Sequence, residues 1–191
     1  MKIFFIGAVT GKKLLDESYK KIYNLIEELG HKNLDDTIIQ GTSESFYNTL
    51  DKGGRKSDED YYNKIISKLK TADINIFECS FPSLGVGYEV TKSLELSKPT
   101  IILYQEENIP HIFAGNSDEK IIIRNYNSKN IKKVLFEAIE EAKQRSDKRF
   151  NFFINPHLLS YLEKASKELG VTKSTFIRSL LVEHMRKSIA T

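Results

Sequence analysis

The feature that most constrains the fold is an alternation of short apolar runs and longer amphipathic stretches over residues 1–144. The short runs are rich in isoleucine and phenylalanine and have the length of buried strands; they are "KIFFIG", "INIFEC", "TIILY" and "KIIIR". Between them, apolar residues recur every three or four positions, which is typical of a helix with one buried face. Strands that alternate with helices form a parallel sheet covered on both faces. We therefore expect an α/β fold of the flavodoxin or Rossmann-like kind for residues 1–144.

Capping and breaking residues predict where these helices begin and end. The first helix ends at Gly30, the second begins at residue 57 with Ser57 as its cap, and the third runs through "YEVTKSLELS" until Pro99 stops it. A last helix covers "SKNIKKVLFEAIEEAKQ". Residues 33–56 have no clean period and are rich in Gly, Ser, Asp and Lys, so we expect either a lid or binding loop, or a plain surface excursion.

Two glycine-bearing segments follow predicted strands. "GAVTGKK" comes after the first strand and "PSLGVGYE" after "INIFEC". In parallel sheets the ligand crevice lies beyond the carboxyl ends of the strands, so both segments are expected at a candidate site. We expect Glu89 in the first turn of the following helix. Glu89 and Asp73 are then either a pair of catalytic carboxylates, as in glycoside cleavage, or acids that only complement or end a helix.

Composition narrows the class of protein. Apolar residues make up 40% of the chain and charged residues 29%, as in ordinary globular proteins. No apolar run approaches the ~20 residues of a membrane-spanning helix. The single cysteine, Cys79, allows no intramolecular disulfide and no cysteine-based metal cluster. We expect a cytoplasmic protein with no metal and no cofactor.

The pattern changes near residue 145. From Arg145 to Thr191, nine Lys and Arg against four Asp and Glu leave a net charge of +5. "RFNFFIN" alternates like a strand, a helix capped by Asn155 with Pro156 at its first position runs to Gly170, and a second helix begins after Thr172. We predict a second domain over residues 147–191. One strand and two helices cannot bury a core alone, so we expect a homodimer or a higher homo-oligomer.

The first domain resembles a known superfamily. "FFIGAVTGKK", "TADINIFECSFPSLGVGYEV" and "HIFAGN" occur in the order and spacing of the nucleoside 2-deoxyribosyltransferase superfamily, and most resemble its branch of 2'-deoxynucleoside 5'-phosphate N-hydrolases. The resemblance covers roughly residues 1–140. It implies an N-glycosidase that hydrolyses the N-glycosidic bond of a (deoxy)nucleoside 5'-monophosphate through a covalent glycosyl-Glu intermediate.

The resemblance also implies a role for each matching residue. Glu89 matches the nucleophile that attacks C1' of the sugar, and Asp73 matches a carboxylate that protonates the base or positions the sugar. Ser83 matches a hydroxyl that holds the 5'-phosphate, and the segment from Gly7 to Lys13 matches the loop around the nucleotide. The substrate-binding candidates are Gly7, Ala8, Val9, Thr10, Gly11, Lys13, Ser83, Gly85, Gly87 and His111.

Two positions depart from the family pattern. Phe4 stands where the family usually has a tyrosine whose hydroxyl orients the nucleophile, and a phenyl ring cannot donate that hydrogen bond. Pro110 stands at the position of a phosphate-binding serine. His111 beside it either binds phosphate or is merely solvated.

The second domain resembles a ribbon-helix-helix domain over residues 147–188, on the evidence of "KRFNFFINPHLLSYLEKASKELGVTKSTFIRSLLVEHMRK". In that family two strands pair across a dimer and their outward side chains enter the DNA major groove. The resemblance implies base contacts by Arg149, Asn151 and Phe153, and phosphate contacts by Lys173 and Ser174. The alternatives are a module that only dimerises, or one that docks a protein partner through Phe153.

Three functions remain open from the sequence. The first is a nucleotide N-glycosidase whose tail dimerises it and binds double-stranded DNA. The second is a DNA-binding regulator whose weakened glycosidase-like domain senses nucleotides, which Phe4 and Pro110 favour. The third is a deoxyribosyltransferase that moves the sugar between bases.

Overall fold

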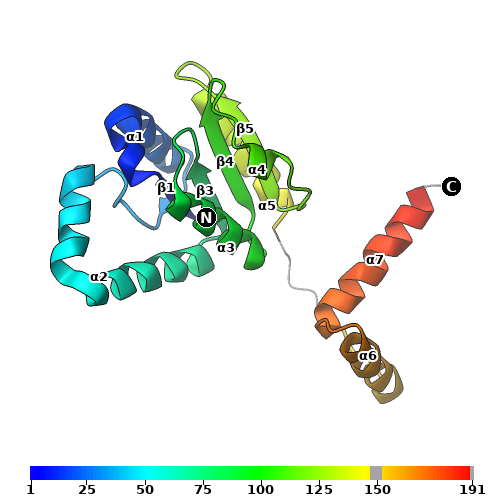
Figure 1. The fold of residues 1–191 in the computed structure, drawn as a ribbon. Helices are drawn as coiled ribbons and strands as arrows, with labels where there is room; N and C mark the ends of the chain where they lie inside the picture. Colours follow the sequence, from blue (N-terminus) through cyan, green and yellow to red (C-terminus); the bar gives the residue numbers. More distant parts are fainter. Residues whose placement is uncertain (147–151, 190–191) are drawn as a thin grey trace. The chain divides into compact units, whose positions relative to one another are not determined.

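A computed structural model describes residues 1–146 and 152–189. The chain divides into two compact units, Met1–Asp147 and Lys148–Thr191. The first unit contains the sheet and the helices α1 to α5, and the second contains α6 and α7 (Figure 1). The two units are described separately below.

The first unit is built on a five-stranded parallel sheet with the strand order β2-β1-β3-β4-β5. The strands are β1 (Lys2–Gly7), β2 (Lys32–Asn33), β3 (Ile74–Glu78), β4 (Thr100–Gln105) and β5 (Ile121–Tyr126). All four long strands were expected from their apolar runs, and the α/β prediction is confirmed. β1 and β3 pair from Ile3 opposite Ile74 to Gly7 opposite Glu78, so their carboxyl ends lie side by side.

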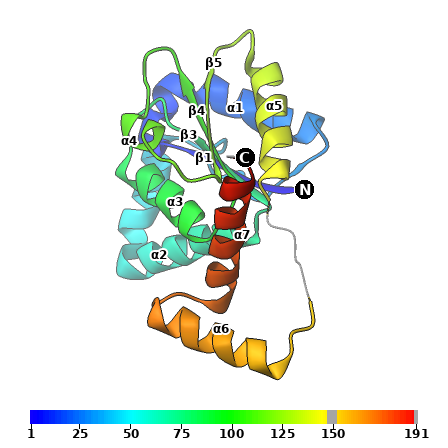
Figure 2. The same cartoon turned by 90° about the vertical axis from the view of Figure 1, so that its right-hand side faces the viewer.

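Helices cover both faces of this sheet (Figures 1 and 2). On one face, α1 (Lys12–Glu28) and α5 (Ile131–Gln144) pack on Ile3, Phe5 and other residues that alternate along the strands. On the other face, α2 (Ser43–Thr71) and α3 (Leu84–Glu95) pack on Phe4, Phe77 and their neighbours. Two short helical turns, η1 (Val9–Gly11) and α4 (His111–Ala114), complete the unit.

Residues 43–56 are helical, so the prediction of an irregular segment there is wrong. α2 begins at Ser43, where Thr42 and Ser45 form a reciprocal capping box, and it continues through Ser57 to Thr71. Gly54 interrupts it at φ 54° and ψ −153°, a conformation that favours glycine. α2 is therefore two helices joined at a kink. The predicted start at Ser57 lies three residues after this kink, and the helix before the kink was not predicted because the capping signal at Thr42 has no apolar period behind it.

α3 also begins earlier than predicted. Ser83 is its N-cap, and the Ser83 Oγ accepts a long hydrogen bond from the backbone N–H of Val86 (3.4 Å). "LGVG" is thus the first turn of the helix rather than part of a loop. Glu89 lies in the second turn, pointing to the sheet, so the expectation of a first-turn acid is wrong.

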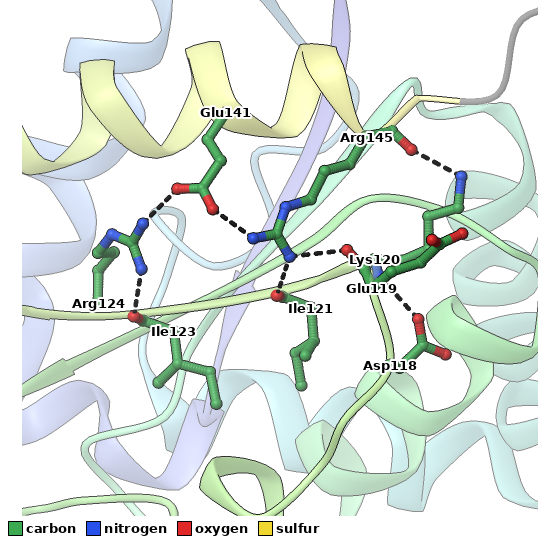
Figure 3. Close-up of polar contacts among 8 residues, drawn as sticks. All are labelled: Asp118, Glu119, Lys120, Ile121, Ile123, Arg124, Glu141 and Arg145. Carbon is green, nitrogen blue, oxygen red and sulfur yellow. Dashed lines mark hydrogen bonds and ion pairs between the residues drawn. The ribbon is translucent and has the colours of Figure 1, made fainter. Parts of the chain in front are cut away.

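Polar contacts fasten the end of α5 to the start of β5 (Figure 3). Glu141 on α5 pairs with both Arg124 and Arg145, and the Arg145 guanidinium also donates to the carbonyls of Glu119 and Ile121 (2.7 Å each). Lys120 Nζ donates in turn to the Arg145 carbonyl (2.6 Å). Arg145, which the sequence grouped with the basic tail, is therefore fixed to the first unit.

In the second unit, α6 (Pro156–Glu168) and α7 (Lys173–Ile189) have the predicted boundaries. Asn155 Oδ1 caps α6 by accepting from the N–H of Leu158 (2.9 Å), and Thr172 Oγ1 accepts from the N–H of Thr175 (3.2 Å). Of the predicted strand at residues 149–155, the described part from Phe152 to Asn155 has no strand structure, and residues 149–151 lie outside the described residues. The ribbon-helix-helix assignment therefore stays a prediction.

The helices of the second unit leave many apolar side chains exposed. Among the described residues of this unit, Leu162 and Phe176 are its buried hydrophobic side chains. The exposed ones lie on both helices and before them: Phe152, Phe153, Leu158, Leu159, Tyr161, Leu169, Val171, Leu180, Leu181, Val182 and Met185. This much exposed apolar surface is unusual for a monomeric unit.

Candidate functional site

The two glycine-bearing segments meet beyond the carboxyl ends of β1 and β3. A Cβ added to Gly11 would lie 2.7 Å from the Cβ of Phe81, so only glycine allows this approach. A Cβ on Gly7 would likewise clash with the ring of Tyr19. These glycines are therefore explained by close packing, although the resemblance placed them in the loop around the nucleotide.

The segment between them is partly buried. Gly7, Ala8 and Gly11 are buried, Val9 is half-buried, and Thr10 and Lys13 are exposed. Ser43, at the start of α2, donates from its Oγ to the carbonyl of Val9, so α2 is tied to this segment. Of the predicted loop residues, Thr10 and Lys13 are thus the ones whose side chains are accessible to a ligand.

Glu89 is the most unusual side chain of the site. It is 94% buried, and its Oε2 has no hydrogen-bond partner among the described residues. Burial raises the pKa of the Glu89 carboxyl from 4.5 to about 8, because desolvation disfavours the charged form. A buried carboxyl without a partner costs stability, and such groups are concentrated at functional sites.

A cavity of about 760 Å³ lies beside this helix, on the outer side of α3. "SFPSL" and the exposed face of α3 form one wall, and residues 107–113 form the other. Ser83, Gly87 and His111 line the cavity, whereas Gly85 and Glu89 do not. Cys79 lines the cavity as well. Burial raises the pKa of the Cys79 thiol to about 12, and the charges of Glu78 and Glu89 make smaller contributions.

Asp73 lies at the opposite end of β3 from Cys79. Asp73 precedes β3, and its Oδ2 accepts from the backbone N–H of Lys2 (2.7 Å) at the amino ends of β1 and β3. Since β3 rises about 3.3 Å per residue, Asp73 lies roughly 20 Å from Cys79 at the other end of the strand. Its position explains it as a clamp between two strand starts, and its catalytic pairing with Glu89 stays a prediction.

The two departures from the family pattern fall near the site. Phe4 is fully buried among the side chains under α2 and α3, on the same face of the sheet as Glu89. Pro110 is the N-cap residue of the one-turn helix α4, and His111 follows it with an exposed side chain. Phe4 thus offers no hydroxyl to Glu89.

Two further groups of this unit received no role from the sequence. Tyr61 on α2 recurs with Ile65 and Leu69 at helical spacing, and burial together with the charge of Glu89 raises its pKa. Glu78, at the end of β3, is fully buried and accepts hydrogen bonds from Ser80 and from the Tyr126 hydroxyl (3.1 Å). In the sequence, Tyr61 stands out as a hydroxyl within an apolar repeat, and Glu78 stands out as an acid inside a strand.

The predicted DNA-contacting residues are only partly described. Arg149 and Asn151 lie outside the described residues. Phe153 is fully exposed, and Lys173 and Ser174 are exposed at the start of α7. Lys173 Nζ pairs with Glu163 of α6 (2.8 Å), which neutralises part of the charge expected at a phosphate contact.

Over residues 1–146 and 152–189, no group of three or more His, Cys, Asp or Glu side chains is arranged to hold a metal ion. None of the helices in that part of the chain combines the length and the apolar character that a membrane crossing requires.

Comparison with known proteins identifies relatives of the chain. No family model matches it. It is 31% identical over 104 residues to a Syntrophotalea carbinolica protein provisionally named 2'-deoxynucleoside 5'-phosphate N-hydrolase 1, covering 54% of this chain and 68% of that protein. A Methanosarcina mazei protein of the same provisional name is 27% identical over 139 residues, covering 72% and 83%. A solved CMP N-glycosidase from Clostridium botulinum is 17% identical with a TM-score of 0.48, covering 73% of this chain and 99% of that one. By its similarity to these curated relatives, the chain belongs to the 2'-deoxynucleoside 5'-phosphate N-hydrolase family.

Proposed function

We propose that the first unit is a nucleotide N-glycosidase that hydrolyses a (deoxy)nucleoside 5'-monophosphate, with Glu89 as its nucleophile. The relatives carry names of nucleotide N-hydrolases, and the family assignment makes the chain a hydrolase of this class. The observation that carries the proposal is Glu89 itself, buried and unpartnered on α3, a helix of which several residues line the 760 Å³ cavity.

The proposed reaction has two steps. A Glu89 carboxylate oxygen attacks C1' of the sugar and forms an ester as the C1'–N bond breaks, and the departing base takes up a proton. Water then attacks C1', which releases the sugar phosphate, regenerates the Glu89 carboxylate and passes a proton to solvent. Burial of Glu89 excludes competing water from the first step and makes the carboxylate more reactive once it is ionised.

The remaining site residues would bind the substrate. Ser83 and His111 line the cavity and offer a hydroxyl and an imidazole to a phosphate. Thr10 and Lys13 lie exposed on the segment after β1, where an ammonium favours an anionic ligand. Asp73 has no part in this proposal.

The test is release of free base from a panel of ribo- and deoxynucleoside monophosphates, followed by chromatography. We expect base release from at least one nucleotide and a loss of at least ~10³-fold in Glu89→Gln. Glu95→Gln, on the exposed side of the same helix, is the matched control and should keep the parent rate.

Three outcomes contradict the proposal. Equal rates in the parent and in Glu89→Gln would remove Glu89 as nucleophile. Tight nucleotide binding without any base release would favour the sensing function instead. Transfer of the sugar to an added second base would identify a deoxyribosyltransferase.

For the second unit we propose a dimerising, DNA-binding ribbon-helix-helix module. The exposed apolar side chains of α6 and α7 support pairing with a second copy, because few of them are buried within one chain. The net charge of +5 from Arg145 to Thr191 supports attraction to DNA phosphates.

Retention on double-stranded DNA at several salt concentrations tests this module. We expect salt-sensitive binding that Arg149→Ala weakens, together with a dimer by analytical ultracentrifugation. Glu119→Ala in the first unit is the control. A monomer, or equal retention of parent and Arg149→Ala at low salt, would contradict the proposal.

A further inference from the structure

A buried nucleophile must be ionised to react, and Glu89 has nothing to stabilise its charge in the described structure. Its Oε2 is unpartnered, and Phe4, on the same face of the sheet, has no donor. A hydrogen bond to the ionised form of a carboxyl lowers its pKa. The ionised Glu89 carboxylate therefore needs a hydrogen-bond donor, and the elements around it indicate which side chain supplies one.

α2 and α3 lie in contact at the level of Glu89. The hydroxyls of Tyr62 on α2 and Tyr88 on α3 are 3.1 Å apart, and their ring centroids are 6.3 Å apart. Each of these exposed tyrosines has an inward neighbour, which is Tyr61 on α2 and Glu89 on α3. The contact that joins the outer pair thus brings the inner pair to the same side of the sheet.

Tyr61 packs on the core that surrounds Glu89. It contacts the buried cluster that contains Phe4, Val86 and Val90, and the last two flank Glu89 on the inner face of α3. The ring of Phe46 holds Tyr61 from the other side, with centroids 5.3 Å apart and planes at 76°. The Tyr61 ring is therefore fixed by packing on two sides, one of them the core that includes the neighbours of Glu89 on α3.

Electrostatics agrees with this placement. Burial raises the pKa of Tyr61, and the charges of Glu89, Tyr47 and Asp35 raise it further. Cys79 is the other described group whose raised pKa reflects the charge of Glu89. A thiol is a weak donor, whereas a phenol is a strong one. Within residues 1–146 and 152–189, the Tyr61 hydroxyl forms no hydrogen bond that would occupy it elsewhere.

We propose that Tyr61 is a positioning residue, whose hydroxyl donates to the ionised Glu89 carboxylate and supplies from α2 the hydrogen bond that Phe4 cannot supply from β1. The inference rests on the proposed role of Glu89 as nucleophile. It also gives a function to α2, whose first turn is tied to the segment after β1 through Ser43.

The experiment compares base release as a function of pH in the parent, Tyr61→Phe and Tyr62→Phe. We expect Tyr61→Phe to lower kcat by ~10- to 100-fold while KM changes little, because the lost hydrogen bond is to a charged group. We also expect the acid limb of the rate profile to move to higher pH. Tyr62→Phe, which removes a neighbouring hydroxyl from the same helix contact, should keep the parent profile.

Two further arms keep the test decisive. The double variant Phe4→Tyr with Tyr61→Phe should recover part of the rate, since the hydroxyl then returns from β1. A titration of the Glu89 carboxyl by infrared spectroscopy, with Glu89→Gln as the blank, should show a higher pKa in Tyr61→Phe than in the parent. This titration needs no turnover.

The failure of this inference is distinct from that of the proposed function. An active parent whose kcat and acid limb are unchanged in Tyr61→Phe overturns the role of Tyr61 and leaves Glu89 as nucleophile. A parent that releases no base refutes the proposed function, and the titration then decides the inference by itself. An equal Glu89 pKa in the parent and in Tyr61→Phe overturns it.

Discussion

Two buried glutamates lie on opposite faces of the same sheet, and their surroundings differ in one respect. Glu78, at the end of β3 on the face covered by α1 and α5, accepts hydrogen bonds from Ser80 and Tyr126. Glu89, on α3 over the other face, has an oxygen with no partner among the described residues. Burial raises the pKa of both carboxyls, and at Glu78 the hydrogen bonds counteract this effect.

The comparison separates an acid with hydrogen-bond partners, Glu78, from the proposed nucleophile, Glu89. Ser80 also accepts from the backbone N–H of Gln105 (2.8 Å), and Gln105 donates to Tyr126 (2.8 Å), so Glu78 joins the ends of β3, β4 and β5. Such a satisfied network contributes to stability. An unsatisfied carboxyl costs stability, and its retention is explained when it acts on a ligand.

The largest expected effect is on stability at Glu78. Glu78→Ala should lower the free energy of unfolding by ~3–4 kcal/mol, because it leaves buried donors on Ser80 and Tyr126 unpaired and opens a cavity. Urea unfolding measures this, with Glu119→Ala on the surface as the control. A loss below ~1 kcal/mol would show that Glu78 is not the structural member of the pair.

A smaller effect of opposite sign is expected at Glu89, and it depends on pH. The folded-state pKa of about 8 lies above the value of 4.5 for a free carboxyl. The contribution of Glu89 to stability is therefore fully present below pH 4.5 and is lost as the pH rises through about 8. Glu89→Gln removes this loss, so it should be more stable than the parent at pH 8.5 and differ little from it at pH 4.5.

Urea unfolding at both pH values, with Glu95→Gln as control, measures the difference. Cys79 and Tyr61 are the other titratable groups that experience the charge of Glu89, and their raised pKa values lie above this pH range. A parent and a Glu89→Gln variant with parallel pH dependence would mean that Glu89 is hydrated or paired, and the contrast with Glu78 would disappear.

The smallest expected effect is at Asp73. Its substitution tests whether this third acid is structural, like Glu78, or takes part in the reaction. Asp73→Ala should cost ~1 kcal/mol through the lost hydrogen bond to Lys2 at an exposed position. We expect base release to stay within ~2-fold of the parent, because a surface change this far from the site alters little. A loss of 100-fold or more at full stability would return Asp73 to the mechanism.

The elements that the sequence predicted best are those with strong local patterns. The four long strands are apolar runs whose character follows from burial on both faces. The caps at Asn155 and Thr172 follow from side chains that bond the adjacent backbone. Apolar runs and capping residues act within a few positions of the chain, so they can be recognised without knowledge of the fold.

The missed features depend on partners distant in sequence. The first half of α2 lacks an apolar period because few of its residues are buried, and it is secured through Ser43 to Val9, 34 positions away. Gly7 and Gly11 resemble ligand-binding glycines in the sequence, yet their close neighbours are Tyr19 and Phe81. No local pattern distinguishes the two explanations.

By itself, the sequence determined the α/β fold, the family of the first unit and the presence of a carboxylate after "SLGVGY", because apolar periodicity and motif spacing are properties of the chain. Only the tertiary structure decided which of the acids Asp73, Glu78 and Glu89 are buried and which of them have hydrogen-bond partners. Parallel pairing of β1 and β3 sends Asp73 to one end of the sheet and Cys79 to the other, while the pleat and α3 bury Glu78 and Glu89 on opposite faces. Burial and hydrogen bonding, which set the pKa of a carboxyl, exist only once those elements have packed.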